Sequence, residues 1–231
     1  MEVLIHSGIN NSKEIKGVGV VIDVFRATTT IACLINARAD KIIVIPDAEK
    51  IKKYCNLKNH VCFSELVKEG YDNSPTVALT SQIRGKTAVI STTNGTKSII
   101  AAKNCEKIIT ASFVNIDAVV NYLIELEPPV ISLIPAGHIP SNTQAVEDTL
   151  CAHAIRNRLQ GLPIDDRQIR KILFRAISDR TLDLNNNEDY QVYVDMLLCC
   201  AIGILNVVPE VIFDKKQILI TNAQTQISLK N

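Results

Sequence analysis

The alternation of short β-branched runs with helical segments is the strongest constraint on the fold. Strands are expected at Glu2–His6, Val18–Ile22, Lys41–Ile45, Val61–Phe63, Thr87–Ile90, Lys107–Thr110 and Val130–Ile134. Helices are expected at Thr28–Ala37, Ala48–Asn56, Thr96–Ala102, Ile116–Glu127 and Gln144–Leu159. Such alternation is typical of an α/β fold, with a mostly parallel sheet covered by helices on both faces.

The chain becomes mainly helical after Gly161. Helices are expected at Asp166–Ile177 and Glu188–Leu205, before a short strand pair at Val211–Phe213 and Gln217–Ile220. This portion is expected to return a β edge to the sheet or to a small subdomain. Because no Ser/Gly/Pro-rich linker interrupts the chain, we expect one domain over 1–231, with 1–160 and 161–231 as its lobes.

Composition favours a soluble, cytoplasmic protein. Hydrophobic residues make up 47% of the 231 residues, which is enough to bury a sizeable core. The 25 Lys and Arg residues against 24 Asp and Glu are dispersed along the chain, so a nucleic-acid partner is not expected. No leader-like segment opens the sequence, and the apolar run Met196–Leu205 is too short to span a membrane.

The seven cysteines show no metal-binding or disulfide spacing. They are Cys33, Cys55, Cys62, Cys105, Cys151, Cys199 and Cys200. Their number is odd and no CxxC occurs, so neither a disulfide framework nor a zinc knuckle is expected.

The segment that follows the strand Val18–Ile22 has the residues needed to bind a metal and a phosphate. Asp23 stands where the strand should end, where it could ligate Mg²⁺ or attack phosphorus. Arg26 can form a bidentate hydrogen bond with an oxyanion, and Thr28, Thr29 and Thr30 offer hydroxyls at a helix start. A charged strand end with a threonine helix cap explains these residues equally well.

A second segment has the same arrangement. The strand Thr87–Ile90 is followed by Thr92, Thr93, Asn94, Gly95, Thr96 and Lys97. If this strand runs parallel to Val18–Ile22, the two polar ends face the same rim of the sheet. Taken alone, an Asn-Gly pair is more often just a turn.

An ordered set of motifs marks a family resemblance. DVFRATTT, NSP at Asn73–Pro75, TTNGTK, ASFVN at Ala111–Asn115, PAG at Pro135–Gly137 and EDTLCA at Glu147–Ala152 occur in one order. The chain resembles the 2-phosphosulfolactate phosphatases of coenzyme M biosynthesis. The resemblance implies a Mg²⁺-dependent phosphomonoesterase of an unusual α/β fold that releases phosphate and 3-sulfolactate from a small anionic phosphoester.

Two departures from the family pattern concern substrate choice. Around Glu65 the chain reads FSEL and then GYDNSP, so Leu66 replaces an arginine and the loop is shorter. The family's NGTR becomes NGTK, and Lys97 binds an oxyanion as a point charge rather than as a planar fork. Two alternatives therefore stay open, namely a Mg²⁺-dependent phosphatase of another small anionic phosphoester and a non-catalytic binder of phosphorylated metabolites.

The resemblance also implies roles for individual residues. Asp23, Arg26 and Asp148 are the expected catalytic residues, and Asp23, Glu65, Asp148 and, as a close second, Glu147 are the expected Mg²⁺ ligands. The expected phosphate-binding residues are Thr28, Thr29, Thr30, Thr93, Asn94, Gly95, Thr96, Lys97 and Ser112. Neighbours on a helix point about 100° apart, so only one of Glu147 and Asp148 is expected to enter the site. Acids in a first helical turn also favour the helix dipole without any ligand.

The group that attacks phosphorus is left open. A water activated by the metal is preferred over Asp23, because dehalogenase-type phosphatases that form an aspartyl phosphate need a second acid where this chain has Phe25. Cys151 lacks a CxxxxxR phosphate loop, so a structural cysteine is the favoured reading. His138 is a candidate for protonating the leaving alkoxide, although a solvated loop histidine fits as well. The resemblance and the apolar late helices suggest a homodimer, but core packing explains those helices equally well.

Overall fold

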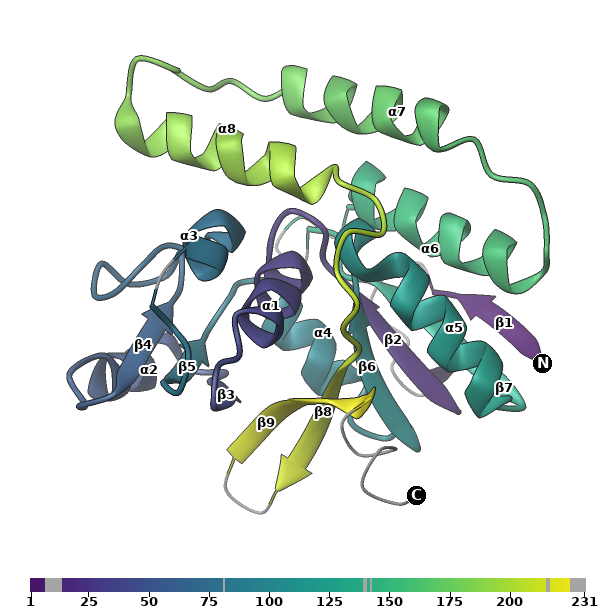
Figure 1. Ribbon diagram of the computed structural model, residues 1–231, viewed down its shortest axis with the longest axis horizontal. Coiled ribbons are helices and arrows are strands. Elements are labelled where there is room, and N and C mark those ends of the chain that lie inside the picture. Colours follow the sequence, from purple (N-terminus) through teal and green to yellow (C-terminus); the bar gives the residue numbers. More distant parts are fainter. Residues whose placement is uncertain (7–13, 81, 139–140, 142, 215–216, 225–231) are drawn as a thin grey trace.

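The computed structural model describes residues 1–6, 14–80, 82–138, 141, 143–214 and 217–224 of the 231-residue chain (Figure 1). Its strands are β1 (Glu2–Ile5), β2 (Val18–Ile22), β3 (Lys41–Val44), β4 (His60–Phe63), β5 (Thr87–Ile90), β6 (Lys107–Ala111), β7 (Val130–Pro135), β8 (Pro209–Asp214) and β9 (Gln217–Asn222). Its α-helices are α1 (Ala27–Asn36), α2 (Ala48–Cys55), α3 (Pro75–Thr80), α4 (Gly95–Ala101), α5 (Ile116–Leu126), α6 (Val146–Leu159), α7 (Asp166–Ser178) and α8 (Asn187–Cys199). A short 3₁₀ helix, η2, spans Phe113–Asn115.

The strands form one mixed sheet, in the order β1-β7-β2-β6-β8-β9-β3-β5-β4 over the described residues. One parallel set comprises β1, β7, β2 and β6, and a second comprises β3, β5 and β4. The hairpin β8–β9 joins them by antiparallel pairing to β6 and to β3. The expected β return is therefore present, but it enters the middle of the sheet. Five of the eight described strand pairings are parallel and three are antiparallel, so the sheet is mostly parallel, as predicted, but mixed. The hairpin satisfies backbone groups that β6 and β3 would otherwise expose as edges.

The hairpin also sets the relative direction of the two parallel sets. Three successive antiparallel pairings, β6–β8, β8–β9 and β9–β3, make the second set antiparallel to the first along the sheet. Neighbouring strands are rotated by roughly 20–25° on average in one sense, so the five steps from β2 to β5 accumulate about 100–125°. This twist offsets the reversal and brings the carboxyl ends of β2 and β5 together.

Helices cover both faces of the sheet, as predicted. All five residues of β2 are buried. Val20 and Ile22 pack into one core with residues of α5, α6, α7 and α8, whereas Val21 faces a second core with residues of α1 and α4. Helix α1 lies between the two parallel sets and packs against β3, β6 and β8 (Figure 1).

The late helices differ from expectation at one end. Helix α8 ends at Cys199 rather than at Leu205. The following segment leaves the helix because the amides of Gly203 and Leu205 donate to the carbonyls of Phe113 and Val114 in η2, at 2.9 and 2.8 Å. None of the described helices is both long enough and apolar enough to cross a membrane.

The short helix α3 was not expected from the sequence. It begins at Pro75, a residue favoured in the first turn because it needs no amide partner there. The amide of Thr76 donates to Asp195 of α8 at 3.2 Å. A side chain distant in sequence therefore caps this helix, which local sequence patterns do not reveal.

Two cysteines are paired, contrary to expectation. Cys55 at the end of α2 and Cys62 on β4 form a disulfide, with their Cα atoms 5.4 Å apart. Helix α2 leads directly into β4, so the two side chains face each other. Cys33, Cys105, Cys151, Cys199 and Cys200 are free.

Candidate active site

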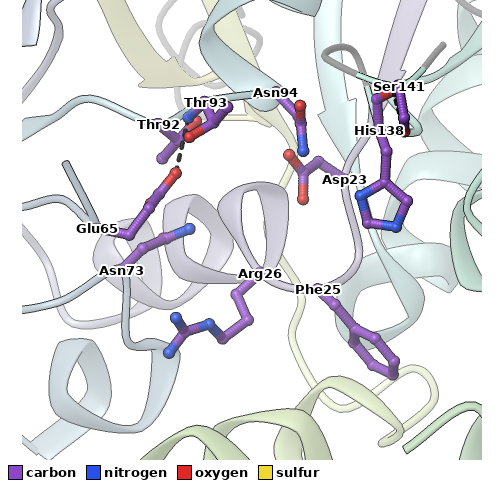
Figure 2. A pocket seen from close by; sticks show the side chains of 10 residues that line it. All are labelled: Asp23, Phe25, Arg26, Glu65, Asn73, Thr92, Thr93, Asn94, His138 and Ser141. Atoms are coloured by element: carbon purple, nitrogen blue, oxygen red, sulfur yellow. Dashed lines mark hydrogen bonds between the residues drawn. The ribbon is translucent and has the colours of Figure 1, made fainter. Parts of the chain in front are cut away.

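A cavity of about 410 Å³ lies where the carboxyl ends of β2 and β5 meet (Figure 2). The described residues that line it are Asp23, Phe25, Arg26, Glu65, Asn73, Thr92, Thr93, Asn94, His138 and Ser141. Most of these side chains are polar, and they come from both motifs that the sequence singled out. The two motifs therefore meet, although β2 and β5 belong to sets that run oppositely along the sheet, so the condition under which the sequence predicted this meeting does not hold.

Thr28 fixes the turn that carries Asp23. Its hydroxyl accepts the amide of Asp23 at 3.0 Å and lies within hydrogen-bond distance of the carbonyls of Asp23 (2.8 Å) and Ala111 (2.7 Å). The amide of Ala27 donates to Asp23 Oδ1 at 3.3 Å. This hydroxyl is thus used by backbone groups, and Thr28 lies outside the cavity lining.

Asp23 is the carboxyl whose ionisation is most suited to chemistry near neutral pH. The pKa of Asp23 is raised to about 7, chiefly by burial; Glu65 and Glu147 also raise it, whereas the amide hydrogen bonds from Ala27 and Gly95 lower it. A carboxyl with this pKa is present in both protonation states around neutrality. It can therefore give or take a proton there.

Gly95 allows the second motif to approach Asp23. A Cβ at this position would lie 2.6 Å from the Cβ of Ala27 and 3.0 Å from Asp23 Oδ2. A glycine is therefore required for the first turn of α4 to lie against Asp23 and for its amide to hydrogen-bond the carboxyl.

Asp148 joins the ends of β2 and β7 from behind the cavity. Its Oδ1 accepts the amide of Val24 at 2.7 Å and its Oδ2 accepts the amide of Gly137 at 3.0 Å. Burial, followed by the charges of Asp23 and Glu147, raises the pKa of Asp148 well above its ordinary value. The side chain is buried and outside the cavity lining, so it positions the two loops.

Glu147 is buried beside Asp148 and is partnered by an arginine. Arg180, which follows α7, donates to Glu147 Oε1 at 3.0 Å. Both acids of the pair are thus buried, and neither lines the cavity.

Glu65 and Thr93 form the opposite wall. The amide of Thr93 donates to Glu65 Oε1 at 2.7 Å, which ties the shortened loop after β4 to the second motif (Figure 2). Asn94 lines the cavity beside them.

The remaining predicted phosphate-binding residues have other surroundings. Thr96 exchanges amide-to-hydroxyl hydrogen bonds with Thr92 at 3.0 and 3.1 Å, and Thr29 donates to the carbonyl of Val24 at 2.9 Å. Ser112 caps η2 through Asn115. Thr30 is buried and Lys97 is exposed, and neither lines the cavity.

Arg26 reaches the cavity wall but is held by two carboxylates. Its Nη1 donates to Asp195 Oδ2 at 2.8 Å and its Nη2 donates to Asp72 Oδ2 at 2.7 Å. Burial acts to lower its pKa, but Asp72 and Asp195 raise the pKa of Arg26 above its ordinary value. Figure 2 shows the guanidinium extending away from Asp23.

Sequence reasoning did not assign roles to Asp72, Asn73, Asp195 or Arg180. Asn73 belonged to the NSP motif that carried the resemblance, so a signal for it was present. Asp195 was detectable as a charge flanked by apolar residues in the second half of α8, and it is 0% exposed in the fold.

His138 and Cys151 differ sharply in their exposure to solvent. His138 lines the cavity and is exposed. Cys151 is fully buried, and burial and then Asp148 raise the pKa of its thiol well above the ordinary value. The thiol stays protonated, which supports the structural reading of this cysteine.

The predicted metal ligands do not form a ready-made cluster. Within the described parts of the chain, no three His, Cys, Asp or Glu side chains converge into a metal-binding group. Asp23, Glu147 and Asp148 nevertheless lie close enough to influence one another electrostatically.

A polar cavity at the carboxyl ends of two strands, with a carboxyl of near-neutral pKa, defines the class as an α/β protein with an enzyme-like site. The family model for 2-phosphosulpholactate phosphatase matches residues 3–212. The chain belongs to that family.

Relatives extend the comparison over most of the chain. A probable 2-phosphosulfolactate phosphatase of Synechocystis sp. is 34% identical over 154 residues, which is 63% of each chain. The match therefore covers less than two-thirds of that relative. Proteins with the same name from Gloeothece citriformis and Symbiobacterium thermophilum are each 29% identical. The matches cover 82% of this chain and 87% of the first, and 90% of this chain and 97% of the second.

Proposed function

We propose that this protein is a phosphoric monoester hydrolase that converts 2-phosphosulfolactate into 3-sulfolactate and phosphate with Mg²⁺. The observation that carries the proposal is the contact between the two motifs, where the amide of Gly95 reaches the carboxyl of Asp23 inside the cavity. Membership of the family supports the choice of substrate.

The cavity suits a small, oxygen-rich anion. Its volume of about 410 Å³ falls in the range of small-molecule sites. Thr92, Thr93 and Asn94 bring hydroxyl and amide groups to one wall, where they can donate hydrogen bonds to phosphoryl oxygens. We assign these residues to binding the phosphoryl group as the ester bond breaks.

Arg26 supplies positive charge at the rim. Asp195, which is fully buried, fixes Nη1, whereas Asp72 is 40% exposed and pairs with Nη2. An anionic group of the substrate can therefore replace Asp72 at Nη2 without moving the rest of the guanidinium. We assign Arg26 to the carboxylate or sulfonate of the substrate.

Asp23 is assigned to proton transfer. In the proposed reaction, water attacks phosphorus, Asp23 accepts its proton, and the bond between phosphorus and the ester oxygen breaks. The leaving alkoxide takes a proton from His138, which lines the same cavity. Because the pKa of Asp23 is about 7, its carboxylate form is available at neutral pH.

The acidic side chains fit a divalent cation. Asp23, Glu147 and Asp148 are all buried, and in the described structure the ion pair that offsets their charge is Arg180 with Glu147. Carboxylate oxygens are the ligands Mg²⁺ prefers, and it commonly binds through one or two of them while keeping several waters. We assign Asp23 and Asp148 to this role, with Glu65 and Glu147 as further candidates. When bound, Mg²⁺ would neutralise charge that develops on the phosphoryl oxygens.

The test is phosphate release from 2-phosphosulfolactate, with 2-phospholactate and phosphoglycolate beside it, in Mg²⁺ and in EDTA. We expect turnover that prefers the sulfonate and stops in EDTA. Equal turnover of all three esters would indicate a broader phosphatase. Absence of turnover in folded, Mg²⁺-supplied protein would leave a binding role. A cytoplasmic location, a homodimer and a place in coenzyme M biosynthesis stay predictions.

A further inference from the structure

Asn73 has an unused hydrogen-bonding atom at the cavity. The side chain is 4% exposed, and its Oδ1 has no hydrogen-bond partner among the described residues. Several other described side chains also have such an atom, but Asn73 is the one that lines the cavity. Leaving a buried acceptor unpaired costs free energy, so a carboxamide held in this way at the cavity wall calls for an explanation in the function of the site.

The residues on both sides of Asn73 are held in place. Asp72 binds Nη2 of Arg26 at 2.7 Å, and the hydroxyl of Ser74 donates to Asp195 Oδ1 at 2.7 Å. Asp195 also binds Nη1 of the same arginine at 2.8 Å. The backbone around Asn73 is therefore fixed from two directions, and the orientation of its carboxamide is a built feature of the site.

The carboxamide faces groups of mixed charge. Figure 2 shows its nitrogen directed into the space between Glu65 and Arg26. A neutral carboxamide offers donors at Nδ2 and an acceptor at Oδ1. A tetrahedral phosphoryl group in the cavity can accept from Nδ2, whereas Oδ1 faces the protein interior.

We propose that Asn73 is a ligand-binding residue of this cavity, whose Nδ2 donates to a phosphoryl oxygen. The inference rests on the proposed function, because its ligand is the phosphoester or phosphate of that reaction. It adds a residue to which neither the family name nor the motifs assign a role.

Two variants test the proposal in the full-length protein. Asn73→Leu keeps a similar volume and removes both polar atoms, whereas Asn73→Asp keeps acceptors and replaces the donor with negative charge. The affinity for inorganic phosphate is measured by isothermal titration calorimetry with and without MgCl₂, and Tm is measured without ligand. Asn104→Ala is the matched control, because Asn104 is exposed and outside the cavity lining.

We expect Asn73→Leu to bind phosphate about tenfold more weakly or worse, and Asn73→Asp to bind still more weakly. The Tm of ligand-free Asn73→Leu should equal or exceed that of the unmodified protein, because replacing a residue that binds only the ligand removes no hydrogen bond within the protein. Asn104→Ala should match the unmodified protein in both measurements.

Unchanged phosphate affinity in Asn73→Leu would overturn the inference, and so would a clear fall in its Tm, which would reveal a structural role. Failure of the unmodified protein to bind phosphate would overturn it together with the proposed function. If no ester is hydrolysed but phosphate affinity depends on Asn73, the proposed activity fails and the inference stands. Normal turnover with an unchanged KM and unchanged phosphate affinity in Asn73→Leu would remove the inference alone.

Discussion

The two parallel sets of strands bring different chemistry to one cavity. The set that contains β2 and β7 positions the buried acids Asp23 and Asp148, and α6 adds Glu147. The set that contains β5 contributes neutral hydroxyl and amide groups at Thr93 and Asn94. The gathering of acids on the first side, away from solvent, raises the pKa of Asp23 and Asp148. In the proposed function, proton transfer belongs to the first side and binding of the phosphoryl oxygens to the second, while Arg26 from the first side and Glu65 from the second cross this division. Mutations should therefore separate proton transfer from phosphoryl binding.

The largest effect is expected from Asp23→Asn. The amide keeps the shape of the side chain but cannot accept a proton near neutral pH, so we expect kcat to fall by about 10³-fold, within the range of general-base loss. Phosphate affinity should stay within about threefold if the second side carries binding. Steady-state kinetics and calorimetry measure the two quantities. A variant that keeps more than a tenth of the activity would contradict the assignment of Asp23.

The same variant should alter the pH dependence of stability. Because the pKa of Asp23 rises from its ordinary 3.8 to about 7 on folding, the folded state binds more protons than the unfolded state between those values. The contribution of Asp23 to stability therefore falls as pH rises from about 4 to 7. The free energy of unfolding of Asp23→Asn, relative to the unmodified protein, should grow over this range by up to about 4 kcal/mol.

Urea unfolding in EDTA at several pH values measures this difference. Thr93→Ala, on the second side, serves as the control and should give a difference that does not vary with pH. A flat difference for Asp23→Asn would mean that the pKa of Asp23 is not raised on folding.

Asp148→Asn should have a smaller effect that combines stability and rate. One oxygen of Asp148 must give way to an NH₂ group, which cannot accept from the amide of Val24 or of Gly137. We expect a loss of about 1–3 kcal/mol in the free energy of unfolding. Displacement of the loops that it joins should lower kcat by roughly 10–100-fold. Wild-type stability in this variant would show that Asp148 does not hold the two loops.

Asn94→Ala tests substrate binding on the second side, and Lys97→Ala tests whether the binding surface extends beyond the cavity. Asn94 lines the cavity, so its loss should raise KM by roughly tenfold with less change in kcat. Lys97 is exposed and outside the cavity lining, and its replacement should change neither constant by more than about twofold. A large effect at Lys97 would move the binding surface onto the outer face of α4.

Most elements of the fold were predictable because their signals are local. Runs such as Val18–Ile22 and Thr87–Ile90 have the pattern of buried strands, and the observed strands have the same bounds. Helix α3 and the end of α8 were not predictable in this way. Helix α3 is capped by Asp195, and the segment after α8 leaves the helix because it forms hydrogen bonds to η2. Both contacts join residues far apart in sequence.

The residues of the candidate site also divide into those whose role local patterns predict and those whose surroundings only the fold determines. Asp23, Thr93 and Asn94 were identified from polar residues that follow strands and Glu65 from the family resemblance, and all four line the cavity. Thr28 and Thr96 belong to the same motifs and Ser112 to the ASFVN motif, but their hydroxyl groups contact nearby backbone or capping groups. A sequence shows which residues can bind phosphate but not where each hydroxyl points, because that depends on neighbours fixed by the fold.

The sequence by itself determined the buried strands, the two polar strand ends and the family, since each is written in residue types at short spacing. Only the tertiary structure decided that the hairpin β8–β9 lies in the middle of the sheet. It also decided that the twist of the sheet brings the ends of β2 and β5 together. It also decided that Asp23 titrates near neutral pH and that Asp195 holds Arg26. The physical reason is that burial and charge depend on residues 40 to 170 positions away, whose distances no local pattern specifies.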